Sequence, residues 1–224
     1  RGLGDVYKRQ APDSWDALLN YMRSKGFTNQ ELYDANLVRM SNKNGKAHYY
    51  DNFKNRAMVP IIDLRGNVIA FGGRVLDDSK PKYINTSDTL VYKKSNGVFA
   101  LNFAKNGNPS QIIVAEGYMD VIALHQAGFT NSIACLGTAL TQEQARLVSR
   151  YADEVVLSYD SDEAGQKATR RAIDIFSKTG VKIRVLKLTG GKDPDEIIKK
   201  FGKEKFRSLI DGAANDIEYS ILRE

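Results

Sequence analysis

Six carboxylates in the second half of the chain have the residue types and spacing to form one site. They follow three apolar runs and are Glu116, Asp120, Asp160, Asp162, Asp193 and Asp195. Two carboxylates about 4 Å apart repel each other by about 4 kcal/mol at an effective dielectric of about 20, so several stay ionised together only if cations join them. A ligand set made only of oxygen, with no His or Cys nearby, favours Mg²⁺ or Mn²⁺ over zinc. The chemistry predicted is phosphoryl or nucleotidyl transfer, in which the metal orients a phosphate and offsets its charge.

Each of these acids also has a purely structural interpretation. The motif Asp-Ser-Asp at 160–162 could cap a helix that starts near Glu163. The motif Asp-Pro-Asp at 193–195 could form a turn in which Asp195 caps the helix starting at Glu196. Gly137 and Thr138 either help to bind phosphate or only turn the chain before the next helix. The metal interpretation therefore depends on whether the acids of all three strand ends meet.

Alternating apolar runs and amphipathic stretches are the elements that must position these acids. Strands are predicted at 112–115, 133–136, 155–157 and 183–188, and helices at about 118–127, 141–151 and 164–178. Strands that are apolar throughout suit a parallel sheet covered on both faces, with right-handed crossovers between strands. Ligands of such sheets gather beyond the carboxyl ends of the strands, where the acids follow. The predicted fold class is α/β in this half, and α+β overall.

The first half predicts a smaller mixed α+β subdomain. Residues 1–10 have no periodicity and are predicted to be a non-native or scar segment without a role. Asp13 or Ser14 should cap a helix that carries Trp15, predicted as a core residue, and Gly26 should end this helix. Thr28 should cap a second helix.

A polar loop is predicted at 41–45, and a pair of strands at 58–63 and 68–71, joined by a turn at 65–67. Pro60 places the first of these strands at an edge or a bulge. Gly72 and Gly73 predict a close approach of the backbone to another group.

Positive charge is concentrated in the first half. Residues 1–108 hold 17 Lys or Arg against 10 Asp or Glu, whereas residues 109–224 hold 16 against 17. Aromatic residues lie among the cations of 54–105, namely Phe71, Tyr83, Tyr92 and Phe99. Cations beside ring faces suit single-stranded nucleic acid. The alternative is that the rings belong to the core and the lysines are simply solvated.

Composition predicts a globular intracellular protein. The single cysteine, Cys135, lies in an apolar run, which fits a buried thiol in a reducing cytosol. No stretch approaches the roughly 18 apolar residues of a membrane span, and no secretory signal is visible. The segment 106–109 is the predicted boundary between a basic subdomain at 11–108 and the sheet domain at 109–207, which is followed by the start of a truncated helical subdomain at 208–224.

The acidic motifs resemble those of the Toprim fold, which bacterial primases, topoisomerases and some nucleases share. The flanking segments are similar to the RNA-polymerase core of the bacterial replicative DNA primases of the DnaG type. The segments that carry this second resemblance are 11–16 (APDSWD), 55–61 (NRAMVPI), 71–74 (FGGR) and 81–85 (PKYIN). The resemblance covers nearly everything from Ala11 onwards.

The resemblance implies roles for particular residues. Glu116 matches an invariant glutamate proposed as a base or metal contact, and Asp120 lies in the same motif. Asp160, Asp162, Asp193 and Asp195 match metal-binding acids. Arg74, Lys82 and Lys94 match basic residues that line a template groove and touch incoming nucleotides, and Arg56 falls in a matching motif.

The family makes short RNA primers on single-stranded DNA from ribonucleoside triphosphates with Mg²⁺, and it acts in the cytoplasm at the nucleoid and replisome. The implied partners are single-stranded DNA, ribonucleoside triphosphates, the RNA–DNA hybrid product and the replicative helicase, with no membrane. One Cys and two His cannot build the zinc module with which family members begin. We therefore expect a primase fragment without zinc, without the segment before Ala11 and without the helicase-binding region. The alternatives are another Toprim phosphotransfer enzyme, of topoisomerase or nuclease type, and a non-catalytic fragment that binds single-stranded DNA.

Overall fold

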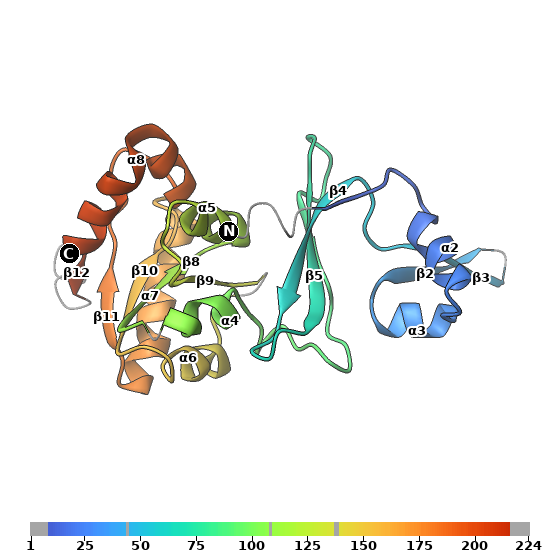
Figure 1. Ribbon diagram of the computed structural model, residues 1–224, viewed down its shortest axis with the longest axis horizontal. Helices are drawn as coiled ribbons and strands as arrows, with labels where there is room; N and C mark the ends of the chain where they lie inside the picture. The colour runs from blue at the N-terminus through green and yellow to red at the C-terminus, as the bar shows by residue number, and fades with distance from the viewer. Residues whose placement is uncertain (1–8, 44, 108, 137–138, 216–224) are drawn as a thin grey trace. The chain divides into compact units, whose positions relative to one another are not determined.

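Continuous apolar runs form the centre of a six-stranded sheet. The computed structural model describes residues 9–43, 45–107, 109–136 and 139–215 (Figure 1). The chain divides into two units, one formed by residues 62–67 and 94 onwards, and the other by residues up to 61 and 68–93. Each unit is described by itself.

The first of these units, which we call the sheet unit, contains the predicted parallel strands. β8 (Gln111–Ala115), β9 (Ser132–Cys135), β10 (Glu154–Ser158) and β11 (Lys182–Val185) are mutually parallel, in the order β11-β10-β8-β9. Two short antiparallel strands that the sequence pattern does not predict, β7 (Val98–Phe99) and β12 (Ala214–Asn215), extend the sheet at its edges. The fold is therefore mixed α+β, with a largely parallel sheet flanked by helices.

The helices of the sheet unit cover both faces of the sheet. The predicted helices are α5 (Tyr118–Gln126), α6 (Gln142–Val148) and α7 (Glu163–Phe176). The unit also contains α4 (Leu101–Ala104) and α8 (Pro194–Asp211), and Gly202, with a φ of 80°, interrupts α8. Short 3₁₀ turns, η1 (Lys105–Gly107) and η2 (Ser177–Thr179), follow α4 and α7.

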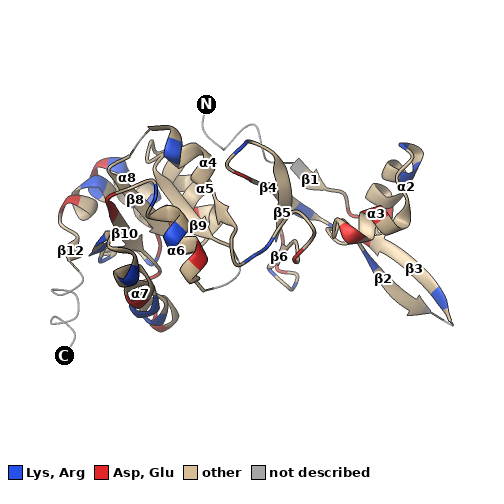
Figure 2. Ribbon diagram, turned by 90° about the horizontal axis from the view of Figure 1, so that it is seen from below, with Lys and Arg blue, Asp and Glu red and all other residues tan. Residues whose placement is uncertain are grey.

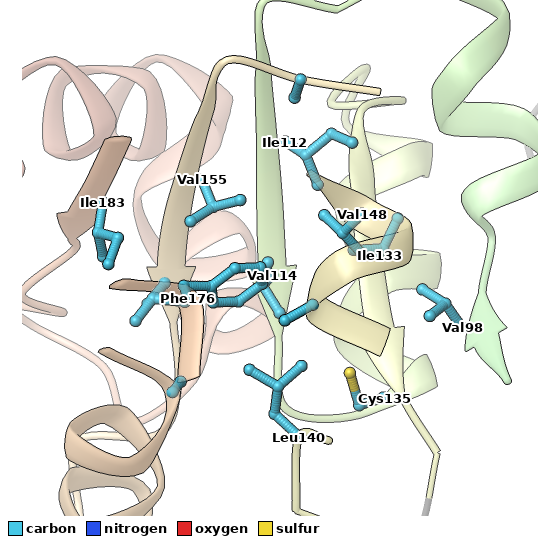
Figure 3. Close-up of a cluster of buried hydrophobic side chains, with 14 of the residues drawn as sticks. Val98, Ile112, Val114, Ile133, Cys135, Leu140, Val148, Val155, Phe176 and Ile183 are labelled. Carbon is cyan, nitrogen blue, oxygen red and sulfur yellow. The ribbon is translucent and has the colours of Figure 1, made fainter. Parts of the chain in front are cut away.

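Side chains of alternate strand positions fill the space under α4, α6 and α7. Ile112, Val114, Val155 and Leu157 pack there against Phe176 of α7, and Figure 3 labels several members of this cluster. Cys135 lies in the same cluster as a free buried thiol, as predicted, and burial raises its pKa to about 12.

The division between units falls at Lys94 rather than at 106–109, because β7 pairs with β9 and α4 joins the sheet core. The turn of residues 62–67 also belongs to the sheet unit, where Leu64 packs against the core and accepts a hydrogen bond from Lys105 Nζ. At the other end, α8 continues to Asp211 and β12 joins the sheet, while residues 216–224 lie outside the described part of the chain.

The other unit, which we call the basic unit, contains a four-stranded sheet in the order β1-β4-β5-β6. Its strands are β1 (Arg9–Ala11), β4 (Arg56–Ile62), β5 (Val68–Val75) and β6 (Tyr83–Asn85). Residues 9 and 10 therefore have a structural role, contrary to prediction, whereas residues 1–8 are not described. β4 lies between β1 and β5, so Pro60 is on an inner strand and not at an edge. Gly73 confirms the predicted close approach, because a β-carbon there would lie 2.9 Å from the Phe53 ring.

Two helices, α2 (Ala17–Ser24) and α3 (Asn29–Asp34), lie on one side of a hairpin formed by β2 (Val38–Lys43) and β3 (Lys46–Asp51) (Figure 2). The hairpin replaces most of the predicted loop at 41–45. Gly26 follows the end of α2 with a φ of +92°, and Thr28 caps α3 with Glu31, both as predicted.

The predicted cap of α2 is wrong. Neither Asp13 nor Ser14 caps this helix; instead both carboxylate oxygens of Asp51, at the end of β3, accept hydrogen bonds from the helix, from Leu18 N (2.7 Å) and Leu19 N (2.9 Å). Trp15 was expected in the core and is 60% exposed, because it precedes the helix and the cluster of Leu19, Leu32 and Val38 closes without it. None of the helices in the described residues is both long and apolar enough to cross a bilayer.

Candidate functional site

The acids at the carboxyl edge of the large sheet come from three neighbouring strands. β10 lies between β8 and β11, so the segments that follow these strands start side by side. Asp160 N donates to Glu116 Oε2 at 3.3 Å, which joins the segment after β10 to the one after β8. Ser161 N donates to the carbonyl of Lys192 at 3.1 Å, which joins the same segment to the loop after β11. The predicted adjacency of the three acidic segments is thus present in the structure.

Three of the acids also accept hydrogen bonds from backbone N–H groups at helix starts, and of these only the cap by the Asp-Ser-Asp motif was anticipated. Asp162 Oδ1 accepts from Gly165 N at the start of α7 (2.8 Å), and Asp193 Oδ1 accepts from Glu196 N at the start of α8 (2.8 Å). Asp120 Oδ2 accepts from Gly117 N (3.2 Å). The cap of α8 is therefore Asp193 and not Asp195, and Asp195 instead pairs with Lys199 at 2.5 Å. These hydrogen bonds fix the carboxylates in place. Each bond uses one of the two oxygens of its carboxylate.

Mutual repulsion and burial raise the pKa of two acids in this cluster. The pKa of Asp120 rises to about 7, first because the group is buried and then because Asp160, Asp193 and Asp195 are nearby. The pKa of Asp160 rises to about 6, again first through burial and then through Glu116, Asp193 and Asp162, while Lys192 acts in the opposite direction. Negative charge from all six predicted positions therefore acts within one region of the sheet unit.

These side chains fit a site in which the protein and the substrate together supply the ligands of a hard divalent cation. They fit less well a site in which the protein supplies every ligand. All six side chains offer carboxylate oxygens, which Mg²⁺ and Mn²⁺ prefer. Among the residues that the structure describes, no three His, Cys, Asp or Glu side chains form a group that could hold a metal ion. Mg²⁺ commonly takes only one or two carboxylates and completes its shell with water and substrate phosphates. The raised pKa values of Asp120 and Asp160 are the observation in favour of a cation, because it would relieve the repulsion.

Gly165 and Lys192 are parts of this site that the sequence analysis does not assign. A β-carbon at position 165 would lie 2.1 Å from the carbonyl oxygen of Asp160. The first turn of α7 can approach the acidic segment this closely only with glycine at that position. Lys192 supplies the positive charge that opposes the pKa shift of Asp160. The sequence signals were present in the strings DSDEAG and GGKDPD, but a glycine near a helix start has many uses.

A cavity of about 370 Å³ adjoins Glu116, and Ala115, Cys135, Leu140 and Tyr159 are among its lining residues. Burial, followed by Cys135 and Glu116, raises the pKa of Tyr159 far above its usual value. Gly137 and Thr138, the predicted phosphate contacts, lie outside the described residues.

Three of the four predicted basic residues gather around β5 and β6 of the basic unit. Arg74 and Tyr83 are register partners, and the Arg74 guanidinium lies 6.0 Å from the centre of the Tyr83 ring. Lys82 Nζ lies 5.7 Å from the same ring, and the buried Arg56 donates to the Lys82 carbonyl at 3.3 Å. Lys94 belongs to the sheet unit, so the structure does not place it with the other three.

Of the aromatic residues predicted to lie among the cations, Tyr92 and Phe99 are core residues, whereas Tyr83 is exposed. The alternative that these rings belong to the core is thus correct for Tyr92 and Phe99.

The sequence analysis misses a second group of cations and rings in the basic unit. A cavity of about 530 Å³, which we call the Trp15 cleft, is lined by rings, cations and acids. Its rings and cations include Trp15, Arg39, Tyr50, Lys54 and Arg56, and its acids are Asp13, Asp51 and Asp77. Lys54 Nζ lies 4.4 Å from the centre of the Trp15 ring and pairs with Asp13 at 3.1 Å. The exposed Trp15 ring meets Tyr50 edge to face at 5.9 Å. An exposed indole beside cations is a surface that suits the bases and phosphates of nucleic acid.

Two family models match separate parts of the chain. Residues 9–105 match the N-terminal domain of the DNA primase catalytic core, and residues 113–198 match a Toprim-like domain. Curated DNA primases are similar over almost the whole chain. The protein of Clostridium acetobutylicum is 51% identical over 214 residues, which are 95% of this chain and 35% of its own length, and that of Deinococcus radiodurans is 41% identical over 94% of this chain and 37% of its own length. The chain therefore spans about a third of the length of these relatives.

The solved structures that are similar to this chain are also DNA primases. A DNA primase domain from Pseudomonas aeruginosa is 38% identical, with a TM-score of 0.86 over 96% of this chain and 68% of that one. The Escherichia coli primase catalytic core is 37% identical, with a TM-score of 0.83 over 93% and 67%. A primase catalytic domain bound to single-stranded DNA is 36% identical, with a TM-score of 0.83 over 93% and 66%.

Proposed function

The chain belongs to the bacterial DNA primase family, and on this premise we propose that it is catalytic-core sequence that joins ribonucleotides on a single-stranded DNA template. The reaction is nucleotidyl transfer: a hydroxyl oxygen forms a bond to the α-phosphorus of a ribonucleoside triphosphate, and pyrophosphate leaves. The observation that carries this proposal is the convergence of acids from three strand ends. Burial, followed by this convergence, raises the pKa of Asp120 and Asp160. The product would be a short RNA paired with the template, made during DNA replication.

We further propose Mg²⁺ or Mn²⁺ as the cofactor. Glu116, Asp160 and Asp162 would hold it, together with Asp193 and Asp195 at the start of α8. When bound, the cation supplies compensation for phosphate charge and a fixed orientation of the reacting groups. The chain's own contribution is to hold these oxygens before the substrate arrives, through helix caps at Asp162 and Asp193 and the contact between Asp160 N and Glu116. Asp120, close to its pKa at neutral pH, would lose its proton readily once a cation is near.

The basic unit would bind the template. The Trp15 cleft offers a stacking ring beside Lys54, Arg39 and Arg56, and the exposed Tyr83 offers a second ring beside Arg74 and Lys82. The Nε atom of Arg74 is buried and has no hydrogen-bond partner among the described residues, so this guanidinium retains capacity for a phosphate. Lys94 would contribute from the sheet unit. A similar catalytic domain has been solved with single-stranded DNA bound.

Further proposals concern the setting of the enzyme. It would act in the cytoplasm at the replisome and work with the replicative helicase through a region outside this sequence. The rival within the Toprim class is a topoisomerase- or nuclease-like enzyme. The rival in another class is a module that only binds single-stranded DNA, for which the acids serve as helix caps alone.

The test is incorporation of labelled ribonucleotides on single-stranded DNA with Mg²⁺ or Mn²⁺. Glu116→Gln and Asp160→Asn should each abolish incorporation and leave DNA binding intact. Asp174→Asn, an exposed acid of α7 outside the cluster, is the matched control and should retain activity. Incorporation at the wild-type level in both cluster variants would remove the acids from the mechanism. DNA cleavage or relaxation without synthesis would favour the other Toprim enzymes, and DNA binding with neither activity would favour the binding module.

A further inference from the structure

The hairpin of the basic unit has two chemically different faces. In an antiparallel pair, residues opposite each other share a face, and successive pairs alternate between faces. One face carries the pairs Val38–Asp51, Met40–Tyr49 and Asn42–Ala47, and the other carries Arg39–Tyr50, Ser41–His48 and Lys43–Lys46. The register alone therefore sorts the hairpin into a face without cations and a face that carries the cations Arg39 and Lys46.

The first face is the one that the helices cover at the base of the hairpin. Val38 is fully buried, and the Tyr49 ring meets Tyr33 of α3 edge to face at 6.4 Å. Asp51 binds the start of α2. The core of this part of the molecule therefore requires only one face of the hairpin.

The second face is left to solvent. Arg39, Lys46 and His48 are exposed, and Ser41 and Tyr50 are half-buried; we call these five residues the cationic face. From Arg39 to Tyr50 the chain contains no Asp or Glu, and Figure 2 shows blue segments along both strands.

The cationic face continues from the Trp15 cleft. Arg39 and Tyr50 line the cleft as well as belonging to the hairpin, and Tyr50 contacts the Trp15 ring at 5.9 Å. Six residues of strand extend roughly 20 Å at about 3.3 Å per residue, so the face could guide a strand of nucleic acid well beyond the cleft.

We propose that the cationic face is an extension of the template site and holds a further stretch of single-stranded DNA that leaves the Trp15 cleft toward the tip of the hairpin. Arg39 and Lys46 would contact phosphates, Ser41 and His48 would donate hydrogen bonds, and Tyr50 would stack on a base beside Trp15. The proposal rests on the template binding proposed above and adds a direction and a length to it.

Single-stranded nucleic acid fits these observations better than an acidic protein segment, because the path begins at the Trp15 and Tyr50 rings, on which bases can stack, and continues to the exposed Lys46. The opposite side of Arg39 opens on a separate cavity that Asp34 and Asp88 also line. Asp13, Asp51 and Asp77 also line the Trp15 cleft, so acids alone do not distinguish the two sides of Arg39. We place the path on the Trp15 side because the Trp15 ring and the cation of Lys54 lie there.

The test uses the double variant Lys46→Gln/His48→Gln, which changes only the distal, exposed part of the face. Binding to oligothymidylates of about 4 and about 16 nucleotides is measured over a range of salt concentrations, since single-stranded sites commonly span about 4–16 nucleotides. For the long oligonucleotide, the slope of log K against log salt should become shallower by about 0.7 for each phosphate that the variant no longer binds. The slope for the short oligonucleotide, which the cleft alone can hold, should not change. Lys25→Gln changes the exposed lysine that follows the last residue of α2; it is the matched control and should alter neither slope.

An unchanged slope for the long oligonucleotide in the double variant would overturn the inference and leave the cleft as the whole template site. A variant that loses binding of a polyglutamate probe but keeps both oligonucleotide slopes would also overturn it, in favour of an acidic protein partner. Failure of the wild-type chain to bind either oligonucleotide would overturn the proposed template binding itself, and the inference with it.

Discussion

The carbonyl oxygen of Asp160 lies 2.1 Å from the position that a β-carbon at Gly165 would occupy. The backbone N–H of the same glycine is the donor to Asp162 Oδ1. One glycine therefore positions both acids of the Asp-Ser-Asp motif, through the absence of a side chain and through its amide.

Gly165→Ala should displace Asp160, because no L-residue with a β-carbon fits that contact, and it should destabilise the fold by about 1–3 kcal/mol through overpacking. Template-dependent incorporation should fall as far as it does in Asp160→Asn, and the affinity for Mn²⁺ should weaken. Titration of the folded variant with Mn²⁺ separates this effect from reduced stability. Gly107→Ala, where a β-carbon would meet no atom within 4 Å, serves as the control. A folded Gly165→Ala protein with wild-type Mn²⁺ affinity would disprove the positioning role.

The raised pKa of Asp120 makes the stability of the metal-free protein depend on pH. An acid whose pKa rises from 3.8 to about 7 on folding contributes stability that is complete below the unfolded pKa. That stability is lost as the pH rises through about 7. We expect the free energy of unfolding of the wild type, minus that of Asp120→Asn, to fall between pH 4 and pH 7 by an amount on the order of 2 kcal/mol.

Addition of Mg²⁺ at pH 7 should reverse part of this loss, because a cation stabilises the ionised cluster. Urea unfolding at several pH values, with and without Mg²⁺, measures both effects. If the two proteins keep a constant difference across this pH range, burial and the neighbouring acids do not raise the pKa of Asp120 as described.

The cap of α2 predicts a stability effect far from the acids. Asp51→Ala removes the acceptor for two helix N–H groups and should destabilise the basic unit by about 1–2 kcal/mol. Asp51→Asn keeps one acceptor oxygen and should cost less. Asp16→Ala is the control, because Asp16 occupies the N-cap position of α2 without making a side-chain cap bond. Equilibrium unfolding in urea ranks the three variants, and a larger loss in Asp16→Ala than in Asp51→Ala would contradict the remote cap.

Trp15 predicts a change in binding without a change in folding. Its side chain is 60% exposed, so Trp15→Ala should leave the unfolding midpoint nearly unchanged. Loss of a stacking platform should weaken binding of single-stranded DNA by about 1–3 kcal/mol. Tyr21→Ala, which removes a ring exposed to a similar extent (59%) on α2, should leave binding unchanged. Equal effects of the two substitutions would show that the cleft has no special part in binding.

The basic residues assigned through the family resemblance make a separate prediction. If Arg74, Lys82 and Lys94 contact three phosphates, their contribution to the slope of log K against log salt is about −2. Replacing all three by Ala should remove that contribution. Restoring Lys94 alone tests whether the sheet unit shares in template binding, because this lysine belongs to that unit. A triple variant with the wild-type slope would place the template elsewhere.

Buried strands and the acids that follow them could be predicted because local sequence determines both. Ile112 to Val114 are apolar at every position, as a doubly covered strand requires. Parallel strands bring their carboxyl ends to one edge, so the neighbourhood of Glu116 and Asp160 follows from topology. That Asp193 and not Asp195 caps α8 depends on where the helix begins, which the pattern does not determine to one residue.

The basic unit was harder to predict because its contacts are less local. The β2–β3 hairpin buries little along its distal half, so its residues show no apolar alternation for a sequence pattern to detect. The cap of α2 comes from Asp51, more than 30 residues away from the helix it caps. Trp15 extends the apolar stripe of α2 by one position, and only its place before the first helical turn leaves it in solvent.

Cys135 gives the experiments on the hairpin a practical advantage. Its thiol is buried, and its pKa of about 12 keeps it protonated and unreactive near neutral pH. A second cysteine introduced at the exposed Ala47 would therefore be the only thiol that a maleimide dye modifies. Fluorescence from such a probe could report the approach of an oligonucleotide to the hairpin in otherwise native protein.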